Sequence, residues 1–466
     1  MLMVGGCCRI LPGEDSPCFS FPKKTSMHSF SGRDEIRSWR VSKFMIKACS
    51  KSRDLQKVLS HHRWTICSLG TLHLFLVLLP PQAIAQVGSE DPIGGAEPIP
   101  SRAEVSRAIT LAGAYLERAC GPDGRFKYEV DISTGKEVGS YNIVRHAGAI
   151  YALSMLNRSQ PSRQAVDAMV RAAAYLRHNY IGPGVRPGMQ VVWSKPLPRP
   201  SYAELGATGL SLVALVEVER ARPKSVPLEQ LQALGRFALF LQRDDGSFVD
   251  KYRAKSGPVP DWESLYYPGE AALGFVSLYE ADHSREWLIA AGKALSYLAR
   301  SRAGLSTVPA DHWALIATTR LLPYCEQGAC QASREELVRH AVQVCNSILR
   351  EQFRGSVAAG IDGAFDPTGR TAPAATRLEG LLAALAFLRK GELPEKIEAA
   401  IARGIAFLLR AQISSGPYAG GLPGAVLNRA HAASQIRVDY VQHALCAWLR
   451  YENSIQRNFQ TQTQIP

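Results

Sequence analysis

The chain has 466 residues, of which 46% are hydrophobic and 20% are charged, a composition that suits a globular protein with a sizeable core. Its formal net charge is +13, but residues 1–85 hold 12 Lys/Arg against 5 Asp/Glu, so about half of the basicity lies in that segment. The other basic residues are interspersed along amphipathic stretches, without basic runs among aromatic residues, and this distribution argues against nucleic-acid binding.

A continuous apolar run of 16 residues, WTICSLGTLHLFLVLL at positions 64–79, follows the basic stretch 51–63. Two prolines and the small-residue site Ala83-Ile84-Ala85 come next, and this order is typical of a secretory signal peptide. The run is shorter than the roughly 20 apolar residues that a spanning helix needs. We therefore predict cleavage after Ala85 and export to the periplasm or the exterior. A retained membrane anchor is the alternative, and the protein would then touch a membrane only through this segment.

Two kinds of helical segment alternate along the rest of the chain. Segments with a one-sided apolar stripe lie at 101–120, 163–180, 228–243, 285–302, 334–352 and 395–412. Each is followed by a segment that is apolar on most of its surface: 141–156, 203–218, 266–280, 309–322, 374–388 and 436–451. A one-sided stripe suits a helix between core and water, whereas an apolar cylinder requires burial on all sides. Six such hairpins predict an all-α (α/α)6 toroid with an inner and an outer ring of helices.

The domain boundaries follow from these segments. Residues 101–452 are assigned to the toroid, 86–100 to a linker and 453–466 to a disordered tail. Because a signal peptide begins near the start of a protein, it is assigned to residues 45–85, and residues 1–44 are interpreted as a mis-assigned start or a disordered leader.

Polar residues of the inner segments gather at their amino-terminal turns, which six parallel helices would bring to one mouth. Helix amino termini stabilise carboxylates, arginines bind anionic groups bidentately, and carboxyl or imidazole groups in unequal environments suit general acid–base catalysis. The predicted catalytic residues are Glu270, Asp311, His312, Asp439 and His443. The predicted substrate-binding residues are Asn142, Arg145, His146, Glu204, Tyr267, Trp313, Arg377, Glu379 and Tyr440.

Each of these residues has a structural alternative. Any carboxylate at a helix start is a candidate cap or ion-pair partner, and His146 precedes small residues that suit a buried core histidine. Asp439 and His443 are four positions apart and share a helix face, so they are candidates for an ion pair. The presence of such residues on all six helices favours a functional cavity. We expect Glu270, Asp311 and His312 to line the same cavity as Arg145, His146, Asp439 and His443.

Three loops that follow outer helices combine glycine turns with aromatic residues: 121–137, 244–253 and 416–424. Glycine supplies the positive φ values that such turns need. The loops either pack on the rim of the toroid or cover a cleft, and the sequence leaves both open.

Five cysteines lie beyond residue 85, and this odd number cannot pair completely. Cys325 and Cys330 flank a short loop between two helices, so a local disulfide and two free buried thiols are both plausible. We expect no metal and no cofactor, because the chain has no CxxC or HExxH sequence.

Four helix starts resemble those of bacterial six-hairpin (α/α)6 proteins: YNIVRHAG at 141–148, YPGEAAL at 267–273, DHW at 311–313 and DYVQHAL at 439–445. This superfamily includes glycosidases, uronyl lyases, N-acylglucosamine 2-epimerases and the catalytic domains similar to glucuronyl C5-epimerases. The resemblance covers about residues 100–452. It implies a toroid and a glycan substrate, but it specifies the fold better than the reaction.

A second resemblance concerns the segment QRDDGSF at 242–248, which is similar to a repeat of terpenoid cyclase and prenyltransferase toroids. The chain has no DxDD acid motif. It also lacks a recognisable Asp, Cys and His pattern for a prenyltransferase zinc site, so this resemblance is the weaker one.

Our first hypothesis is an exported carbohydrate-active enzyme that processes a polysaccharide or a uronic-acid-containing glycan by hydrolysis, elimination or epimerisation. The second is a non-catalytic glycan-binding toroid in cell-envelope or exopolysaccharide assembly. The third is a terpenoid-type toroid, which an aromatic-lined apolar cavity would favour and an acidic open cleft would exclude.

Overall fold

The computed structural model describes residues 99–462 except 356–359, 389–390 and 428–430, and all of them belong to the unit Glu90–Pro466. The expected leader, the signal peptide and most of the linker lie outside the described residues. No helix in the described part of the chain is long and apolar enough to cross a membrane.

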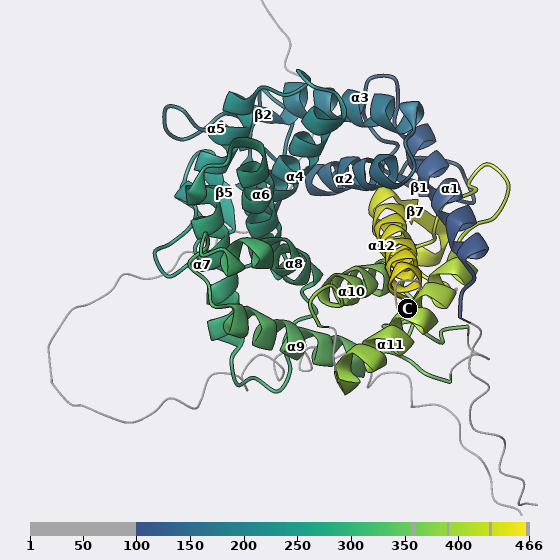
Figure 1. The fold of residues 1–466 in the computed structure, drawn as a ribbon. Helices are drawn as coiled ribbons and strands as arrows, with labels where there is room; N and C mark the ends of the chain where they lie inside the picture. Colours follow the sequence, from purple (N-terminus) through teal and green to yellow (C-terminus); the bar gives the residue numbers. More distant parts are fainter. Residues whose placement is uncertain (1–98, 356–359, 389–390, 428–430, 463–466) are drawn as a thin grey trace, which may run out of the picture. The chain divides into compact units, whose positions relative to one another are not determined.

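Twelve helices in the described residues form two concentric rings (Figure 1). The inner ring consists of α2 (Ile143–Ser159), α4 (Leu205–Ala221), α6 (Tyr267–Asp282), α8 (His312–Glu326), α10 (Thr371–Ala384) and α12 (Val438–Gln462). The outer ring consists of α1 (Arg102–Ala119), α3 (Arg163–Tyr180), α5 (Leu228–Phe240), α7 (Arg285–Arg302), α9 (Arg334–Glu351) and α11 (Glu392–Ala411). Consecutive inner helices pack against each other, and α12 packs against α2. The inner ring is therefore closed, and the predicted (α/α)6 toroid is confirmed.

Burial explains which helix lies in which ring. Every residue of α4 from Leu205 to Val218 is buried, as an inner helix requires. In α9, by contrast, the buried residues form one stripe: Leu337, His340, Ala341, Val344, Cys345, Ser347 and Ile348. Glycines allow the inner helices to approach closely, since a Cβ atom at Gly209 of α4 would lie 2.6 Å from the backbone of Glu270 in α6.

Several helix boundaries differ from the expected ones, and for two of them the sequence gives a physical reason. Helix α8 begins at His312 rather than at residue 309, because Asp311 is its N-cap and accepts the backbone N–H of Ala314. Helix α12 continues to Gln462, where the sequence led us to expect a disordered tail from residue 453. Residues 453–462 contain neither glycine nor proline, so no residue there breaks the helix.

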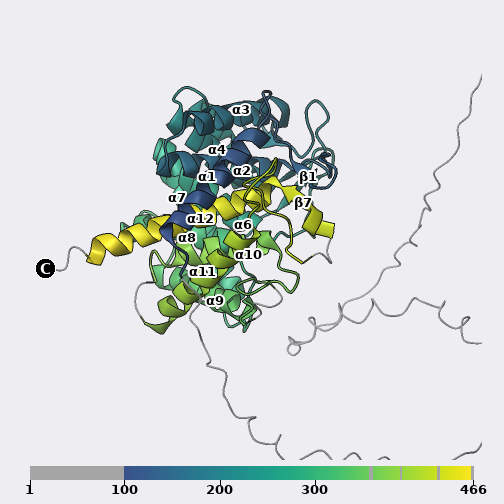
Figure 2. The ribbon, with the colours of Figure 1, turned by 90° about the vertical axis from the view of Figure 1, so that its right-hand side faces the viewer.

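Short antiparallel strands lie in the connections that lead into the inner helices. Strand β1 (Glu129–Asp131) pairs with β7 (Gln435–Arg437), and β2 (Ile181–Pro183) pairs with β3 (Gln190–Val192). Strands β4 (Tyr202–Glu204), β5 (Lys251–Arg253) and β6 (Gly257–Pro258) form a three-stranded sheet. Figure 2 shows β1 and β7 at one end of the ring and the carboxyl end of α12 at the other. The amino-terminal mouth of the inner ring thus carries the longer, structured connections.

A disulfide joins Cys325 to Cys330 in the turn between α8 and α9. The other three cysteines in the described part of the chain, Cys120, Cys345 and Cys446, are free and buried. Of the two alternatives left open by the sequence, the structure therefore shows the local disulfide.

Candidate functional site

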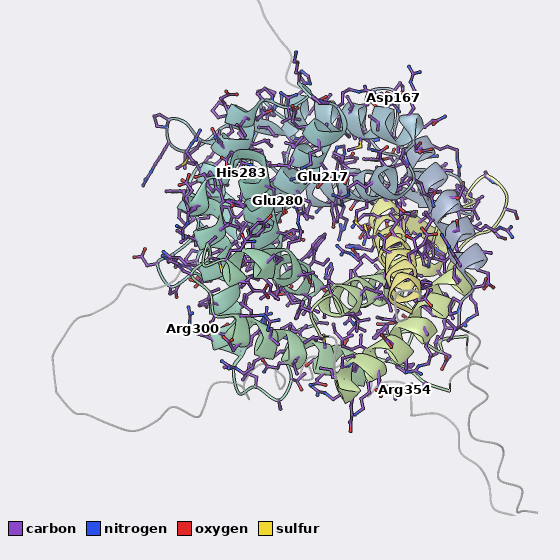
Figure 3. The ribbon with its side chains drawn as sticks, viewed as in Figure 1. Asp167, Glu217, Glu280, His283, Arg300 and Arg354 are labelled. Carbon is purple, nitrogen blue, oxygen red and sulfur yellow. A yellow bond between two sulfur atoms is a disulfide. The ribbon has the colours of Figure 1, made fainter. Side chains whose placement is uncertain are left out.

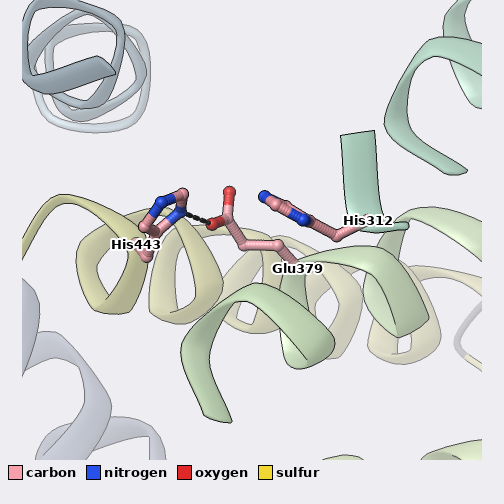
Figure 4. A group of neighbouring side chains, drawn as sticks. All are labelled: His312, Glu379 and His443. Carbon is pink, nitrogen blue, oxygen red and sulfur yellow. Dashed lines mark hydrogen bonds and ion pairs between the residues drawn. The ribbon is translucent and has the colours of Figure 1, made fainter. Parts of the chain in front are cut away.

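Three residues from neighbouring inner helices meet at the amino-terminal mouth: His312 of α8, Glu379 of α10 and His443 of α12, here called the central cluster (Figure 4). Figure 4 shows the Glu379 side chain between the two imidazoles. His443 Nδ1 and Glu379 Oε1 are 2.6 Å apart and hydrogen-bonded. One side-chain nitrogen or oxygen from each residue lies within 4.8 Å of those of the other two. The structure thus brings together two predicted catalytic residues and one predicted substrate-binding residue.

Several polar atoms of the central cluster are buried without a hydrogen-bond partner among the described residues. They are both ring nitrogens of His312 and Oε2 of Glu379. Burial, together with the charges of His443, Arg377 and Arg450, holds the pKa of His312 well below its usual range. A buried polar group without a partner costs about 1–3 kcal/mol, so three such atoms in one place indicate that the cluster is shaped for something other than stability.

Aromatic side chains surround His312. The ring of Tyr266 lies edge-on at 5.1 Å between centroids, and the ring of Trp313 lies at 4.8 Å. Trp313 is itself buried and lies 6.2 Å from Tyr151 of α2. His443 is the most accessible member of the cluster, with 13% of its side chain exposed, whereas Glu379 is fully buried. A ligand that enters the mouth would therefore reach His443 first.

A second group, here called the acidic group, consists of Glu204, Asp250 and Glu270 beside α4 and α6. Glu270 is buried, and its Oε2 atom has no partner among the described residues. Burial, with the nearby charges of Asp311, Glu204 and Asp250, holds its pKa well above the usual range. Burial also raises the pKa of Glu204 and that of Tyr267, whose hydroxyl is hydrogen-bonded to Glu204. Burial and the neighbouring acids therefore favour the protonated form of Glu270.

Sequence reasoning missed Asp250 as an individual residue, although it identified the loop 244–253 that contains it. The backbone N–H of Ser264 donates to Asp250 Oδ2 at 2.7 Å, while Oδ1 is buried without a partner among the described residues. Burial raises the pKa of Asp250 to about 6. The available signal was the position of this acid directly before β5, which pairs with the strand that ends at Glu204.

Asp439 holds two arginines at the same mouth. Arg437 donates to it through Nε at 2.6 Å and Nη2 at 3.0 Å, and Arg145 Nε lies 3.1 Å from Oδ2. Burial alone would raise the pKa of Asp439, but the bonds from Arg437 and the charge of Arg145 outweigh it and lower the pKa. The charge of Arg145 also acts on Glu204 and Glu270. Arg145 therefore binds Asp439 and also lies near enough to the acidic group for its charge to act there.

His443 does not form the ion pair with Asp439 that its spacing made a candidate. Its Nδ1 atom is bonded to Glu379 on the neighbouring helix, while the carboxylate of Asp439 binds the two arginines. Tyr440 lies beside them, with the Arg437 guanidinium 4.5 Å from its ring centroid.

Asp311 has the contacts of a structural residue, because it caps α8 and pairs with Arg302. One carboxylate oxygen accepts the N–H of Ala314 at 3.0 Å, and the other accepts Arg302 Nη2 of the outer helix α7 at 3.0 Å. Its side chain is fully buried. Burial raises its pKa, although the Arg302 charge opposes this. Both oxygens are thus occupied away from the mouth, as the capping alternative predicts.

His146 is likewise turned toward the outer ring rather than the mouth. Its Nδ1 is bonded to the Tyr141 hydroxyl at 2.7 Å, and its Nε2 to the carbonyl oxygen of Ala172 in α3 at 2.9 Å. It is fully buried, and burial lowers its pKa to about 4. This is the geometry of a core histidine, and it corrects our expectation that His146 lines the cavity.

Two further predicted binding residues have partners within the protein. Asn142 is the N-cap of α2 and accepts the N–H of Arg145. Arg377 donates through Nε to Glu351 at 2.6 Å and through Nη1 to the carbonyl of Pro373. The geometry therefore leaves the central cluster, the acidic group with Tyr267, and the pair Arg145 and Asp439 as the candidate site.

A separate cavity of about 640 Å³ lies at the opposite end of the inner ring. Its lining includes Arg158, Arg220, Arg320, Arg450 and Glu280, and none of the predicted site residues. Figure 3 labels Glu217 and Glu280 on α4 and α6; Glu217 binds Arg158 and Arg220, and Glu280 binds Arg220 and Arg320. Helix carboxyl termini carry negative partial charge, so arginines here neutralise six converging helix ends. We therefore place the candidate site at the amino-terminal mouth.

Comparisons with known proteins bear on the fold. No protein-family model and no curated protein sequence matches the chain. Among solved structures, the cellobiose 2-epimerase of Bacillus thermoamylovorans B4167 is similar with a TM-score of 0.58 and 12% identity, over 76% of this chain and 99% of that chain. The cellobiose 2-epimerase of Spirochaeta thermophila DSM 6192 has a TM-score of 0.57 and 14% identity, over 76% and 97%.

An α-mannanase of Bacteroides thetaiotaomicron is also similar, with a TM-score of 0.55 and 12% identity, over 76% of this chain and 96% of that chain. Identities this low carry information about architecture and not about the reaction. The chain therefore has the six-hairpin (α/α)6 toroid fold that these sugar epimerases and the mannanase share.

Proposed function

We propose that this protein is a carbohydrate-active enzyme that moves protons to and from a sugar at the amino-terminal mouth of its toroid. The observation that carries the proposal is the set of buried titratable groups there, with unpartnered atoms in both the central cluster and the acidic group. Perturbed pKa values and unsatisfied polar atoms in one concave region are typical of active sites. The solved structures that share the fold include sugar epimerases, a mannose isomerase, mannanases and a polysaccharide lyase.

The acidic group supplies the two protonation states that acid–base chemistry needs. Burial and neighbouring acids raise the pKa of Glu270 and so favour its protonated form, which would donate a proton to a sugar oxygen. Asp250, with a pKa of about 6, is ionised at neutral pH and would accept a proton. Two carboxyl groups whose pKa values differ in this way define an acid and a base.

The distribution of these groups around the ring favours epimerisation or isomerisation over glycoside hydrolysis. Asp250 and Glu270, each with one carboxyl oxygen that has no partner among the described residues, belong to the acidic group beside α4 and α6, whereas α8, α10 and α12 carry the central cluster. A glycosidase places two carboxyl groups on either side of the scissile bond. A carboxyl pair together with a cluster that contains imidazoles instead suits proton exchange at the carbon next to a sugar carbonyl. The central cluster would contact the carbonyl oxygen.

Incubation in D2O tests this function directly. Reducing sugars, among them cellobiose, mannose, glucose and glucuronic acid, are incubated with the purified protein, and deuterium at the carbon next to the carbonyl is followed by NMR. We expect exchange and an epimer or isomer for at least one sugar, and loss of both in Glu270→Gln. The matched control is His178→Ala, at an exposed position of α3.

Two results would argue for other functions. Depolymerisation of a polysaccharide without deuterium exchange would favour hydrolysis or elimination, and tight glycan binding without any turnover would favour the non-catalytic alternative. The described residues at the mouth are mainly titratable rather than apolar, so they do not favour the terpenoid alternative.

We also propose that the protein is exported. The apolar run at 64–79 and the small-residue site that ends at Ala85 support export. The Cys325–Cys330 disulfide supports it independently, because such bonds persist mainly in oxidising compartments. Amino-terminal sequencing of protein from the periplasm or medium should give a start near Gln86, and a start well before Ala85 would contradict cleavage there.

A further inference from the structure

The central cluster gathers electron-pair donors that the described residues leave unused. Both ring nitrogens of His312 and Oε2 of Glu379 are buried without a partner. Among the described residues, the only hydrogen-bond or ion-pair partner shown for Glu379 is His443. Two imidazoles and one carboxylate form a ligand set that suits zinc, cobalt, iron and manganese.

We propose that the central cluster binds one divalent transition-metal ion, with one nitrogen each of His312 and His443 and one oxygen of Glu379 as ligands. Catalytic zinc sites have three protein ligands and keep a further position open for water or substrate. This proposal differs from our expectation of no metal, which we drew from the absence of closely spaced metal-binding motifs in the sequence.

The backbone holds the three ligands near one another. A Cβ atom at Gly380, the residue after Glu379, would lie 3.1 Å from both Cα and Cβ of His312. Glycine at this position therefore lets α10 approach α8 at the level of the cluster. On the other side, the hydrogen bond from Glu379 to His443 connects α10 to α12. The ligands thus come from three packed inner helices rather than from flexible loops, as a preorganised metal site requires.

The distances fit an ion after a small movement of side chains. The three donor atoms lie within 4.8 Å of one another, and two metal bonds of about 2.1 Å can join donors up to about 4.2 Å apart. Rotation of the imidazoles toward the centre would close this difference. The hydrogen bond between His443 Nδ1 and Glu379 Oε1 would then be replaced by bonds from both atoms to the ion.

The catalytic role of the ion rests on the proposed function, whereas its binding does not. At the same mouth as the acidic group, the ion would polarise a sugar carbonyl oxygen as a Lewis acid. Asp250 would then take the proton from the neighbouring carbon while Glu270 donates a proton to the sugar oxygen, and the reverse transfers would return both carboxyl groups to their starting states.

Titration of the full chain with single metal ions tests the proposal. The purified protein is treated with EDTA, the chelator is removed, and Zn²⁺ binding is measured by calorimetry. Co²⁺ binding is followed by visible absorption, which reports nitrogen and oxygen ligands and a low coordination number. We expect one Zn²⁺ or Co²⁺ per chain and no comparable binding of Mg²⁺, which prefers six oxygen ligands.

Three single variants remove one ligand each: His312→Ala, Glu379→Gln and His443→Ala. Each should weaken Zn²⁺ binding by about 100-fold or more, since even outer-shell changes cost about 10- to 100-fold. The control His178→Ala, an exposed histidine of α3, should bind Zn²⁺ as the parent does. Glu379→Gln preserves the shape of the side chain, and circular dichroism of the metal-free proteins shows whether each variant is folded.

The outcomes separate this proposal from the proposed function. Unchanged Zn²⁺ affinity in all three folded variants, or no stoichiometric binding to the parent, would overturn the metal site. Sugar turnover that survives EDTA would overturn the catalytic role of the ion and leave the proposed function intact. Stoichiometric binding that depends on all three ligands, in a protein without activity on sugars, would support the site while contradicting the proposed function.

Discussion

Glu379 and His443 are 64 positions apart in the chain, yet their side chains are joined by a hydrogen bond of 2.6 Å between Oε1 and Nδ1. The bond connects α10 to α12 at the amino-terminal mouth, beside the ring of His312, whose nitrogens have no hydrogen-bond partner in the described part of the chain. A carboxylate that binds one nitrogen of an imidazole fixes the orientation of the ring. Glu379 therefore determines how His443 faces an incoming ligand.

Glu379→Gln should impair function far more than folding. The amide keeps the size of the side chain but removes the negative charge that faces His443, and a displaced acid–base or ligand group typically costs about 10²- to 10⁴-fold in rate. The melting temperature should stay within about 4 °C of the parent, because the carboxylate has an unpartnered oxygen and holds no arginine or lysine among the described residues. Turnover per folded molecule and thermal melting check this, and equal losses in both would indicate a structural role.

Asp311→Ala should show the opposite behaviour. Loss of the side chain removes the N-cap of α8 and leaves the buried guanidinium of Arg302 without its partner. Breaking a buried ion pair costs about 3–5 kcal/mol, so we expect a comparable fall in the free energy of unfolding, measured in urea. Activity per folded molecule should fall much less than in Glu270→Gln, because Asp311 acts on the acidic group only through the charge that helps to raise the pKa of Glu270. A variant with parental stability and no activity would restore Asp311 as a catalytic residue.

Asp250 should make stability depend on pH between about 4 and 6. Its folded-state pKa is about 6, above its usual value of 3.8, so the folded state binds this proton more tightly than the unfolded state. The protonated side chain of Asp250 therefore contributes at most about 3 kcal/mol to the free energy of unfolding. This contribution is fully present below the unfolded-state pKa and is lost as pH rises through 6. Asp250→Asn keeps a neutral side chain at every pH. It should therefore gain stability relative to the parent between pH 4 and 7, and a constant difference across this range would contradict the prediction.

Replacement of Cys325 and Cys330 by serine should lower the free energy of unfolding by about 2 kcal/mol, because the disulfide closes a short loop. The matched control is Cys345→Ser, which removes a buried thiol that belongs to no disulfide. Reducing agent should lower the melting temperature of the parent and leave that of the double variant unchanged. Equal effects of reducing agent on both proteins would mean that the disulfide does not form.

The sequence by itself determined the helices, their two classes and the end of the ring where polar residues gather. Helical periodicity is local: a one-sided stripe in α9 and an apolar cylinder in α4 record how much of each surface must leave water. Six repeats of this contrast lead to two rings, and the polar starts of the inner helices then share one mouth. The observed start of α8 differs from the predicted one because the N-cap, rather than hydrophobicity, decides where a helix begins.

Only the tertiary structure decided the partner of each polar side chain. His146 bonds a carbonyl of α3, Asp311 pairs with Arg302 of α7, and His443 pairs with Glu379 rather than with Asp439 on its own helix. These partners lie on other helices, and a sequence does not show which direction around its helix axis a side chain faces toward them. The same reason explains why the central cluster has no motif in the sequence: its three residues are neighbours only because the packed inner ring places α8, α10 and α12 side by side.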